Sequence, residues 1–306
     1  MTLTELKYIV AVARERHFGR AAEACFVSQP TLSVAIKKLE EELDVKIFER
    51  GASEVSVTPL GEEIVRQAQQ VIEQAAAIRE IAKRGKDPVR GPLRLGVIYT
   101  IGPYLLPDLV RNAIEQVPQM PLLLQENFTA RLLEMLRTGE LDCAIMAVPF
   151  PDSGLAVAPL YDEPFMAAVP VSHPLAQRQS VTAEELKNET MLLLGTGHCF
   201  RDHVLEVCPE YARFSSDAEG IRKSFEGSSL ETIKYMVASG MGVTVVPMLS
   251  VPKDEQPHLR YIPFAEPVPT RRVVLAWRRT FTRYEAIAAL RNAIYACPLP
   301  GVKRLS

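Results

Sequence analysis

The sequence predicts an α/β protein in three successive parts: a small helical module, one long helix, and a larger α/β domain built as two lobes. Three observations lead to this prediction. Apolar residues recur at helical spacing from residue 3 onward, an apolar heptad repeat begins near residue 64, and short apolar strands alternate with helices after residue 93. The 306 residues are enough for two or three domains of ordinary size.

The composition narrows the class of protein. A net charge of −2 gives no overall basic field that would indicate nucleic acid. The five cysteines form an odd, widely spaced set, unlike the disulfide framework of a secreted protein. The amino terminus lacks a signal-peptide pattern, and no apolar run is long enough to span a membrane. We therefore expect a cytoplasmic protein in which any disulfide is transient.

The first 45 residues predict a helix-turn-helix. Apolar spacing predicts helices over 3–15 and 19–25, and a third helix opens near Ser28 with Pro30 in its first turn. Two short helices with a tight turn between them, the second opening on small polar residues, are typical of this motif. The alternative is a plain helical subdomain. The expected DNA contacts are Ser28, Gln29, Pro30, Thr31, Ser33, Lys37 and Arg50.

A β-hairpin is predicted after the third helix. Residues 45–50 and 54–57 alternate around a Gly51 turn, which indicates a wing with Arg50 aimed at the phosphate backbone. The first 60 residues hold eight basic and nine acidic side chains, so charge does not decide between DNA binding and the alternative. We expect the acidic cluster Glu40, Glu41, Glu42 and Asp44 to face away from DNA.

The long helix is predicted to pair with a second copy of the chain. Between Gly61 and Arg84 its apolar residues follow spacings of three and four, which makes a narrow seam typical of a coiled coil. The alternative is that the helix packs on its own domain. Residues 85–92 contain two glycines and two prolines and predict a linker. The seam residues are Ile64, Ala68, Val71, Ala75 and Ile78.

The larger domain is predicted to be a parallel α/β sheet in two lobes. A second lobe begins near Phe165, and crossover segments near 160–168 and 264–270 leave a cleft between the lobes. Ligands bind at the carboxyl ends of strands in such sheets, so three strand ends should converge there. They carry Thr100, Thr129 and residues 196–199. Either Arg271 or Arg272 is also expected to reach the site, because strand alternation turns only one inward.

Two cysteines nine positions apart carry the chemistry. Cys199 is flanked by His198 and Arg201, which favour a thiolate, and Cys208 ends a short predicted helix before Pro209. A helix between the cysteines would separate their Cα atoms by roughly 13 Å. A disulfide needs about 4.4–6.8 Å, so the bond requires local refolding, as a redox switch would. Of the remaining cysteines, Cys25 and Cys143 are expected to be buried and inert. The sequence does not indicate whether Cys297 is buried or exposed.

The amino-terminal motifs resemble the LysR-type transcriptional regulators. The resemblance rests on residues 18–23, 28–33, 48–50 and 58–61, and it extends over essentially the whole chain. It implies a winged helix-turn-helix over 1–60, a linker helix over 61–87, and a hinge over 88–92. It also implies a periplasmic-binding-protein-like effector domain. The expected bounds of that domain are 93–163 with 268–306 for lobe I, and 164–267 for lobe II.

The segment His198–Asp202 further resembles the peroxide-sensing members of that family. This implies that hydrogen peroxide oxidises Cys199 to a sulfenic acid and that Cys208 resolves it to a disulfide. The implied regulator is not an enzyme and needs no cofactor or resident metal. Its implied partners are operator DNA, RNA polymerase and further copies of itself, with which it forms a dimer of dimers. The implied function is to activate antioxidant genes. The residues expected to bind or activate peroxide are Thr100, Thr129, His198, Arg201 and Asp202.

Three alternatives remain open at this point. A LysR-type regulator of metabolism would hold a small organic molecule in the cleft. A zinc sensor would use His198, Cys199, His203 and Cys208, although their spacing fits no compact zinc pattern. An enzyme or solute-binding protein with the same two-lobed fold would leave the first ninety residues and the seam unexplained.

Overall fold

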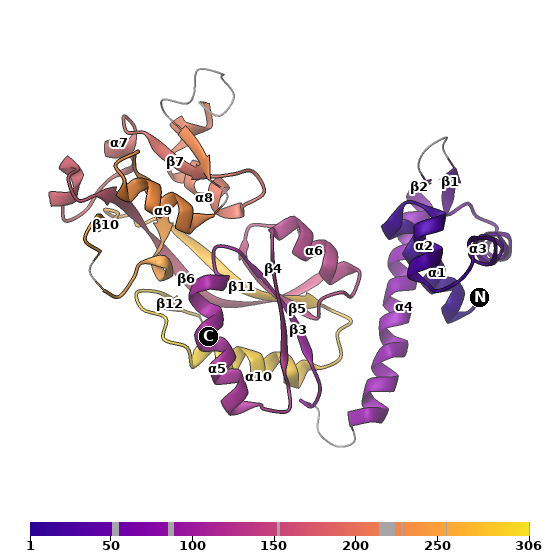
Figure 1. Ribbon diagram of the computed structural model, residues 1–306. Helices are drawn as coiled ribbons and strands as arrows, with labels where there is room; N and C mark the ends of the chain where they lie inside the picture. The colour runs from indigo at the N-terminus through magenta and orange to yellow at the C-terminus, as the bar shows by residue number, and fades with distance from the viewer. Residues whose placement is uncertain are drawn as a thin grey trace. The chain divides into compact units, whose positions relative to one another are not determined.

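A computed structural model describes residues 1–50, 55–84, 89–151, 154–213, 224–227, 229–254 and 256–305 (Figure 1). The chain divides into two compact units. The first holds residues 1–88 with the short segments 137–140 and 280–282, and the second holds the rest. Within the described ranges, no helix is both long enough and apolar enough to cross a membrane.

The first unit is a winged helix-turn-helix followed by a long helix, as the sequence predicted. Its helices begin at residues suited to capping: the Thr2 hydroxyl, the His17 ring and the Ser28 hydroxyl each accept backbone N–H groups of the following turn. The elements are α1 (Leu3–Glu15), α2 (Phe18–Ala24), α3 (Gln29–Leu43), the antiparallel hairpin β1 (Phe48–Arg50) and β2 (Val55–Val57), and α4 (Pro59–Arg84).

Glu40 has a structural role that the sequence did not reveal. Glu40 belongs to the acidic cluster that is expected to face away from DNA, and it is only 8% exposed. Its carboxylate accepts hydrogen bonds from the backbone N–H groups of Ile47 and Phe48, at 2.8 and 3.1 Å. Glu40 therefore ties the end of α3 to the start of the wing.

Helix α4 starts two residues before the predicted Gly61. Some residues of its apolar seam are buried in their own unit, and others are exposed. Ala68 is 3% exposed and belongs to the core of its own unit, and Ile64 packs against the same core. Val71 and Ile78 are exposed. The expected pairing surface is therefore wrong at Ala68, where the alternative of packing on its own domain is correct. The carboxyl half of the helix keeps an apolar surface.

The second unit contains a mixed eight-stranded sheet. Strand order is β10-β6-β11-β5-β3-β4, with β12 and β9 also paired to β6. Strand β3 pairs with β4 on one side and with β5 on the other, and both pairings are parallel, as predicted. Strand β11, however, runs antiparallel to β5 and β6. The prediction of a wholly parallel sheet is wrong because β11 brings the chain back from the second lobe. Helices α5 and α10 pack together beside this sheet (Figure 1).

The helices and strands of the second unit have the following bounds. The strands are β3 (Leu93–Ile98), β4 (Leu122–Asn127), β5 (Cys143–Val148), β6 (Leu155–Pro170), β7 (Met191–Leu194), β8 (Ser224–Gly227), β9 (Thr244–Pro247), β10 (Leu259–Pro263), β11 (Thr270–Arg278) and β12 (Lys303–Arg304). The helices are α5 (Gly102–Gln116), α6 (Thr129–Arg137), α7 (Ala183–Leu186), α8 (Cys199–Val207), α9 (Leu230–Ala238), α10 (Tyr284–Tyr295), and the short 3-10 turns η1 (Pro174–Gln177), η2 (Pro209–Arg213) and η4 (Met248–Ser250).

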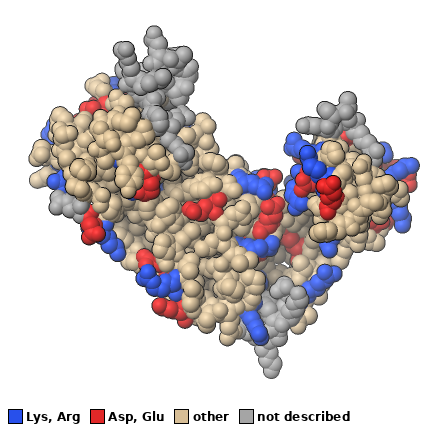
Figure 2. Space-filling model, in the orientation of Figure 1, with Lys and Arg blue, Asp and Glu red and all other residues tan. Residues whose placement is uncertain are grey.

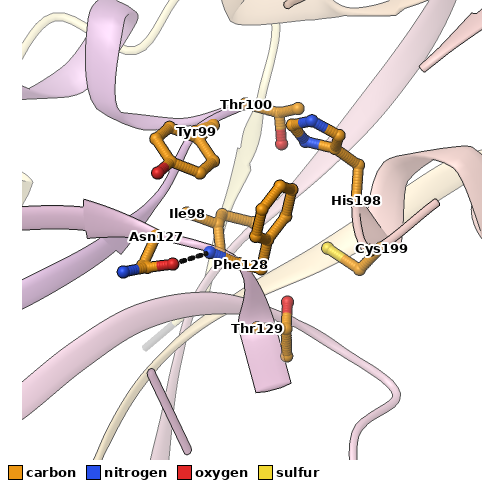
Figure 3. A pocket seen from close by; sticks show the side chains of 9 residues that line it. Ile98, Tyr99, Thr100, Asn127, Phe128, Thr129, His198 and Cys199 are labelled. Carbon is orange, nitrogen blue, oxygen red and sulfur yellow. Dashed lines mark hydrogen bonds between the residues drawn. The ribbon is translucent and has the colours of Figure 1, made fainter. Parts of the chain in front are cut away.

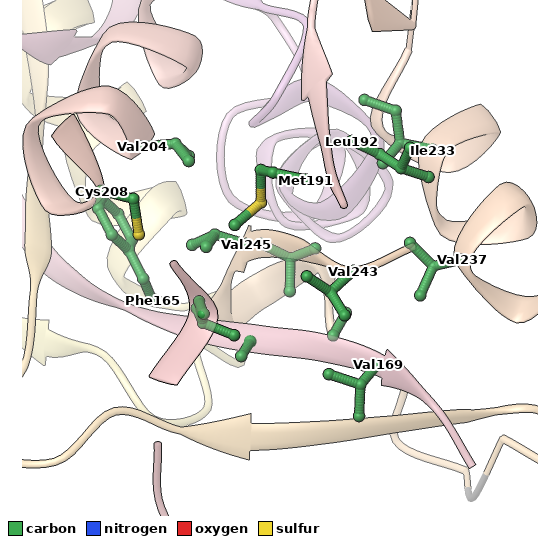
Figure 4. Close-up of a cluster of buried hydrophobic side chains, with 14 of the residues drawn as sticks. Phe165, Val169, Met191, Leu192, Val204, Cys208, Ile233, Val237, Val243 and Val245 are labelled. Atoms are coloured by element: carbon green, nitrogen blue, oxygen red, sulfur yellow. The ribbon is translucent and has the colours of Figure 1, made fainter. Parts of the chain in front are cut away.

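Strand β6 runs unbroken through the segment predicted as a crossover. Up to Pro164 it pairs with β11, and from Phe165 onward it pairs with β9 and then β10. The first crossover is therefore a continuous strand and not a loop. Beyond it lies the second lobe, whose apolar core is drawn in Figure 4 and includes the Cys208 side chain.

We predict that Glu40→Ala will loosen the wing. Hydrogen bonds to a charged group contribute about 1.5–3 kcal/mol, and their loss leaves two buried N–H groups unpaired. Hydrogen–deuterium exchange of the full-length chain is expected to speed up by about tenfold or more at the amides of Ile47 and Phe48. The exposed Glu41→Ala variant is the control and is expected to exchange like the parent. Equal exchange in both variants would contradict the role assigned to Glu40.

Candidate functional site

A small pocket in the second unit gathers three strand ends. Thr100 follows β3, Thr129 follows β4, and Cys199 opens α8 just beyond β7, and all three line the pocket (Figure 3). Its empty volume is about 170 Å³, including the side open to solvent. The complete lining is Ile98, Tyr99, Thr100, Asn127, Phe128, Thr129, Gly197, His198 and Cys199.

Two polar groups of the pocket are available to a small ligand. Cys199 is half-buried and unbonded to another cysteine. The hydroxyl oxygen of Thr129 is buried without a hydrogen-bond partner. In Figure 3 this hydroxyl and the Cys199 sulfur both point into the same space. A buried hydroxyl without a partner is costly, so a small polar molecule beside the sulfur would satisfy it.

Aromatic rings form one wall of the pocket. The His198 ring lies 4.8 Å from the Phe128 ring and 5.8 Å from the Tyr99 ring, measured between centroids. Tyr99 and Phe128 are themselves 5.2 Å apart in an edge-to-face arrangement. His198 is 7% exposed, whereas Tyr99 and Phe128 are both more than a third exposed. Strand-end reasoning would have found these two rings, because they are the immediate neighbours of Thr100 and Thr129.

Arg271, and not Arg272, reaches the pocket. Its guanidinium donates to the Thr100 hydroxyl at 2.8 Å and to the Thr100 carbonyl at 3.0 Å. It also forms a fully buried ion pair with Glu163 at 2.8 Å. Because Thr100 accepts from Arg271, the hydroxyl hydrogen of Thr100 remains to be donated to a ligand. Arg272 is exposed and pairs with Asp162.

Arg201 and Asp202 are not among the residues that line the pocket. The Arg201 side chain is buried and donates to the Leu194 carbonyl at 3.0 Å. It lies two positions beyond Cys199 and therefore about 200° around the helix from it. Asp202 is exposed in the first turn of α8. Arg201 therefore faces away from Cys199, whereas Asp202, three positions after Cys199, lies on the same side of α8.

Cys208 lies at the opposite end of α8 in a different environment. It caps the helix, is fully buried in the second-lobe core near Tyr211, and is drawn in Figure 4. Burial, aided by Glu210, raises the pKa of its thiol to about 11. Cys208 is therefore protonated and unreactive at neutral pH while α8 is in place. The nine-residue helix between the cysteines separates them by roughly 13 Å along its axis.

His203, in the middle of α8, was not recognised from the sequence as anything but a metal ligand. Its Nε2 lies 3.0 Å from the carbonyl oxygen of Val148, and its Nδ1 is buried without a partner. The four residues of the zinc alternative thus have separate surroundings. The described residues contain no group of three or more His, Cys, Asp or Glu side chains that could hold a metal ion.

The other cysteines lie away from the pocket. Cys143 and Cys297 are buried, and burial raises the pKa of both thiols. Cys25 is only half-buried, so the expectation that it is buried is wrong. It follows α2, in the turn before the exposed Phe26.

Most of the expected DNA-contacting residues lie in or just before the first two turns of α3, while Lys37 lies in the middle of that helix and Arg50 ends β1. Ser33 is half-buried, Lys37 forms a long 3.5 Å ion pair with Glu41, and the Arg50 side chain lies outside the described part of the chain. Basic and acidic side chains are interspersed on the visible face of this unit (Figure 2). The exposed members of the set are Ser28, Gln29, Pro30, Thr31 and Lys37.

Comparison with known proteins decides the family. Residues 3–62 match the bacterial regulatory helix-turn-helix of the lysR family, and residues 86–296 match the LysR substrate binding domain. The chain belongs to the LysR family of transcriptional regulators. It is therefore a regulator and not an enzyme, as the sequence motifs indicated.

The LysR-family relatives are peroxide regulators by name. The hydrogen peroxide-inducible genes activator of Pectobacterium carotovorum subsp. carotovorum is 39% identical over 94% of this chain and 95% of the relative. Full-length OxyR from Pseudomonas aeruginosa, with aspartate replacing a cysteine, is 51% identical, with a TM-score of 0.77 and coverage of 97% and 99% of the two chains. An H2O2-bound cysteine-to-serine variant of Corynebacterium glutamicum OxyR is 33% identical, with a TM-score of 0.63 and coverage of 96% and 91%.

We predict different effects for two neighbouring arginine variants. Arg271→Met leaves Glu163 buried and unpaired, which costs about 3–5 kcal/mol of unfolding free energy. Arg272→Met removes an exposed pair, which costs about 0–1 kcal/mol. Urea unfolding of the full chain, followed through the fluorescence of its single tryptophan, Trp277 on β11, measures both. Equal losses of unfolding free energy in the two variants would contradict the larger cost predicted for breaking the buried pair.

Proposed function

We propose that this chain is a hydrogen-peroxide-sensing transcriptional regulator in which Cys199 is the reactive thiol. The observation that carries the proposal is the half-buried Cys199 sulfur in a small pocket beside the unpartnered Thr129 hydroxyl. The H2O2-bound relative supports the choice of oxidant. An organic metabolite is disfavoured, because the pocket has little enclosed space: its volume of about 170 Å³ already includes the side open to solvent.

The first chemical step takes place in the pocket. The hydroxyls of Thr100 and Thr129 hold the peroxide while the Cys199 thiolate attacks one of its oxygens. The O–O bond breaks, an S–O bond forms, and the departing hydroxide takes a proton to become water. Cys199 is then a sulfenic acid.

The second step joins Cys199 to Cys208. The Cys208 sulfur attacks the sulfenic sulfur, the S–O bond breaks, and the hydroxyl leaves as a second water when it takes up the Cys208 proton. The two sulfurs cannot meet while α8 is intact, because its length exceeds the reach of a disulfide. Bond formation therefore requires α8 to unwind and Cys208 to leave the core.

The refolded effector domain then changes the DNA contacts of the oligomer. The exposed start of α3 supplies the base and phosphate contacts, and the exposed Val71 and Ile78 of α4 supply the pairing surface. We place lobe I at 93–163 and 268–306 and lobe II at 164–267, which is supported by the change of β6 partners at Pro164 and Phe165. A dimer of dimers, recruitment of RNA polymerase and a cytoplasmic location complete the proposal.

The cysteine roles predict distinct products after a brief, low dose of peroxide. The parent is expected to yield a peptide pair joined through Cys199 and Cys208, detected by mass spectrometry with free thiols blocked. Cys208→Ser is expected to accumulate a dimedone-reactive sulfenic acid on Cys199, because the resolving thiol is gone. The control Cys297→Ser is expected to match the parent. A Cys199→Ser protein that still responds to peroxide like the parent would overturn the proposal.

The pairing surface of α4 predicts a matched pair of variants. Ile78 is 69% exposed, and Ile78→Lys places a charge at the carboxyl end of the proposed apolar seam. Self-association measured by sedimentation is expected to weaken at least about tenfold, since each copy loses a buried isoleucine. Ala76→Lys, on another face of the same helix, is the control and is expected to associate like the parent. Unchanged association of Ile78→Lys would place the interface elsewhere.

A further inference from the structure

His203 lies halfway along the helix that the proposed switch has to unwind. It is the fifth residue of α8, with Cys199 four positions before it and Cys208 five positions after it. It is 5% exposed, and the lining of the pocket does not include it. Its bonding partner, Val148, is the last residue of β5, a strand of the first lobe.

The protonation of the ring follows from its neighbours. A carbonyl oxygen only accepts hydrogen bonds, so Nε2 carries the hydrogen and donates it to Val148 at 3.0 Å. Nδ1 is then an acceptor, buried without a partner. Burial, together with the nearby Arg271 charge, lowers the pKa of His203, which keeps the ring neutral. Phe165 and Phe200 surround it, with ring centroids at 6.3 and 6.5 Å.

This bond ties the switching helix to the other lobe. The Arg201 side chain of α8 bonds to Leu194, on β7 of the second lobe, to which α8 itself belongs. The His203 side chain bonds instead to β5, whose strand neighbours are β3 and β11. Unwinding α8 would carry the backbone of residue 203 with it, so the bond to Val148 must break before Cys208 reaches Cys199.

We propose that His203 is a positioning residue that holds α8 in its helical, reduced form and so sets how readily Cys208 resolves an oxidised Cys199. This inference rests on the proposed function. The bond is present in the dithiol form and is lost in the disulfide form, so it favours the dithiol. Neither His203 nor Val148 lines the pocket, so we expect the first oxidation step to be unchanged when the bond is removed.

Two variants separate the hydrogen bond from the ring packing. His203→Phe keeps an aromatic ring beside Phe165 and Phe200 but has no hydrogen to donate. His203→Gln loses the ring but carries an amide N–H of similar reach, which restores the donor to Val148. The hydrogen-bond role predicts that the phenylalanine variant departs from the parent and that the glutamine variant resembles it.

The test uses the reduced full-length chain and hydrogen peroxide, with the two steps measured separately. Dimedone capture in a Cys208→Ser background reports sulfenic acid formation, and quenched-flow mass spectrometry reports the Cys199–Cys208 bond. His203→Phe is expected to leave the first rate unchanged and to speed the second about tenfold. Titration in dithiol/disulfide buffers is expected to shift the equilibrium toward the disulfide by about tenfold, or about 30 mV for two electrons.

The outcomes distinguish this inference from the proposed function. A parent chain that forms no Cys199–Cys208 bond overturns both. A parent that forms the bond, with a His203→Phe variant of equal or slower second rate, overturns only the role of His203. If His203→Gln speeds the second step as much as His203→Phe, ring packing and not the hydrogen bond holds the helix, which also overturns the inference. Parent-like behaviour of His203→Gln beside a faster His203→Phe supports it.

Discussion

The helical state of residues 199–207 is the constraint on which the rest of the molecule depends. While these residues form α8, one sulfur lies in a small pocket beside two threonines and the other in an apolar core. The two surroundings give the thiols different reactivities, since burial holds the Cys208 thiol protonated. The same helix presents Arg201 to one lobe and His203 to the other. A change in the length of α8 would therefore alter the contacts of the pocket, of the core and between the lobes.

The sequence predicted the parts of the site that follow from local rules. Thr100, Thr129 and Cys199 were expected to meet because each follows a strand, and they line one pocket. Strand alternation limited the pocket arginine to one of two residues but did not choose between them. The choice depends on Glu163, which lies more than a hundred positions away in the chain and supplies the buried partner. Arg201 was misplaced because adjacency in sequence does not mean a shared face on a helix.

Two residues of the first unit have structural roles that their sequence patterns did not reveal. Glu40 belongs to an acidic run and Ala68 belongs to an apolar repeat, so the role of each was predicted from its neighbours in the sequence. In the structure each is defined by contacts with another element: Glu40 accepts from the backbone entering the wing, and Ala68 packs into the helix-turn-helix core. Periodicity describes one helix at a time. It cannot say which neighbouring element covers part of its surface.

Strand β6 limits how the two lobes can move. A hinge made of loops lets two lobes open and then close around a ligand that lies between them. Here β6 passes between the lobes without a break and is hydrogen-bonded to β11 up to the boundary, so the ribbon resists bending sharply at one point. Its softer deformation is torsion, a change of twist spread over many residues. A change of twist along this ribbon would turn one lobe relative to the other, and a ligand too small to fill a cleft could cause it.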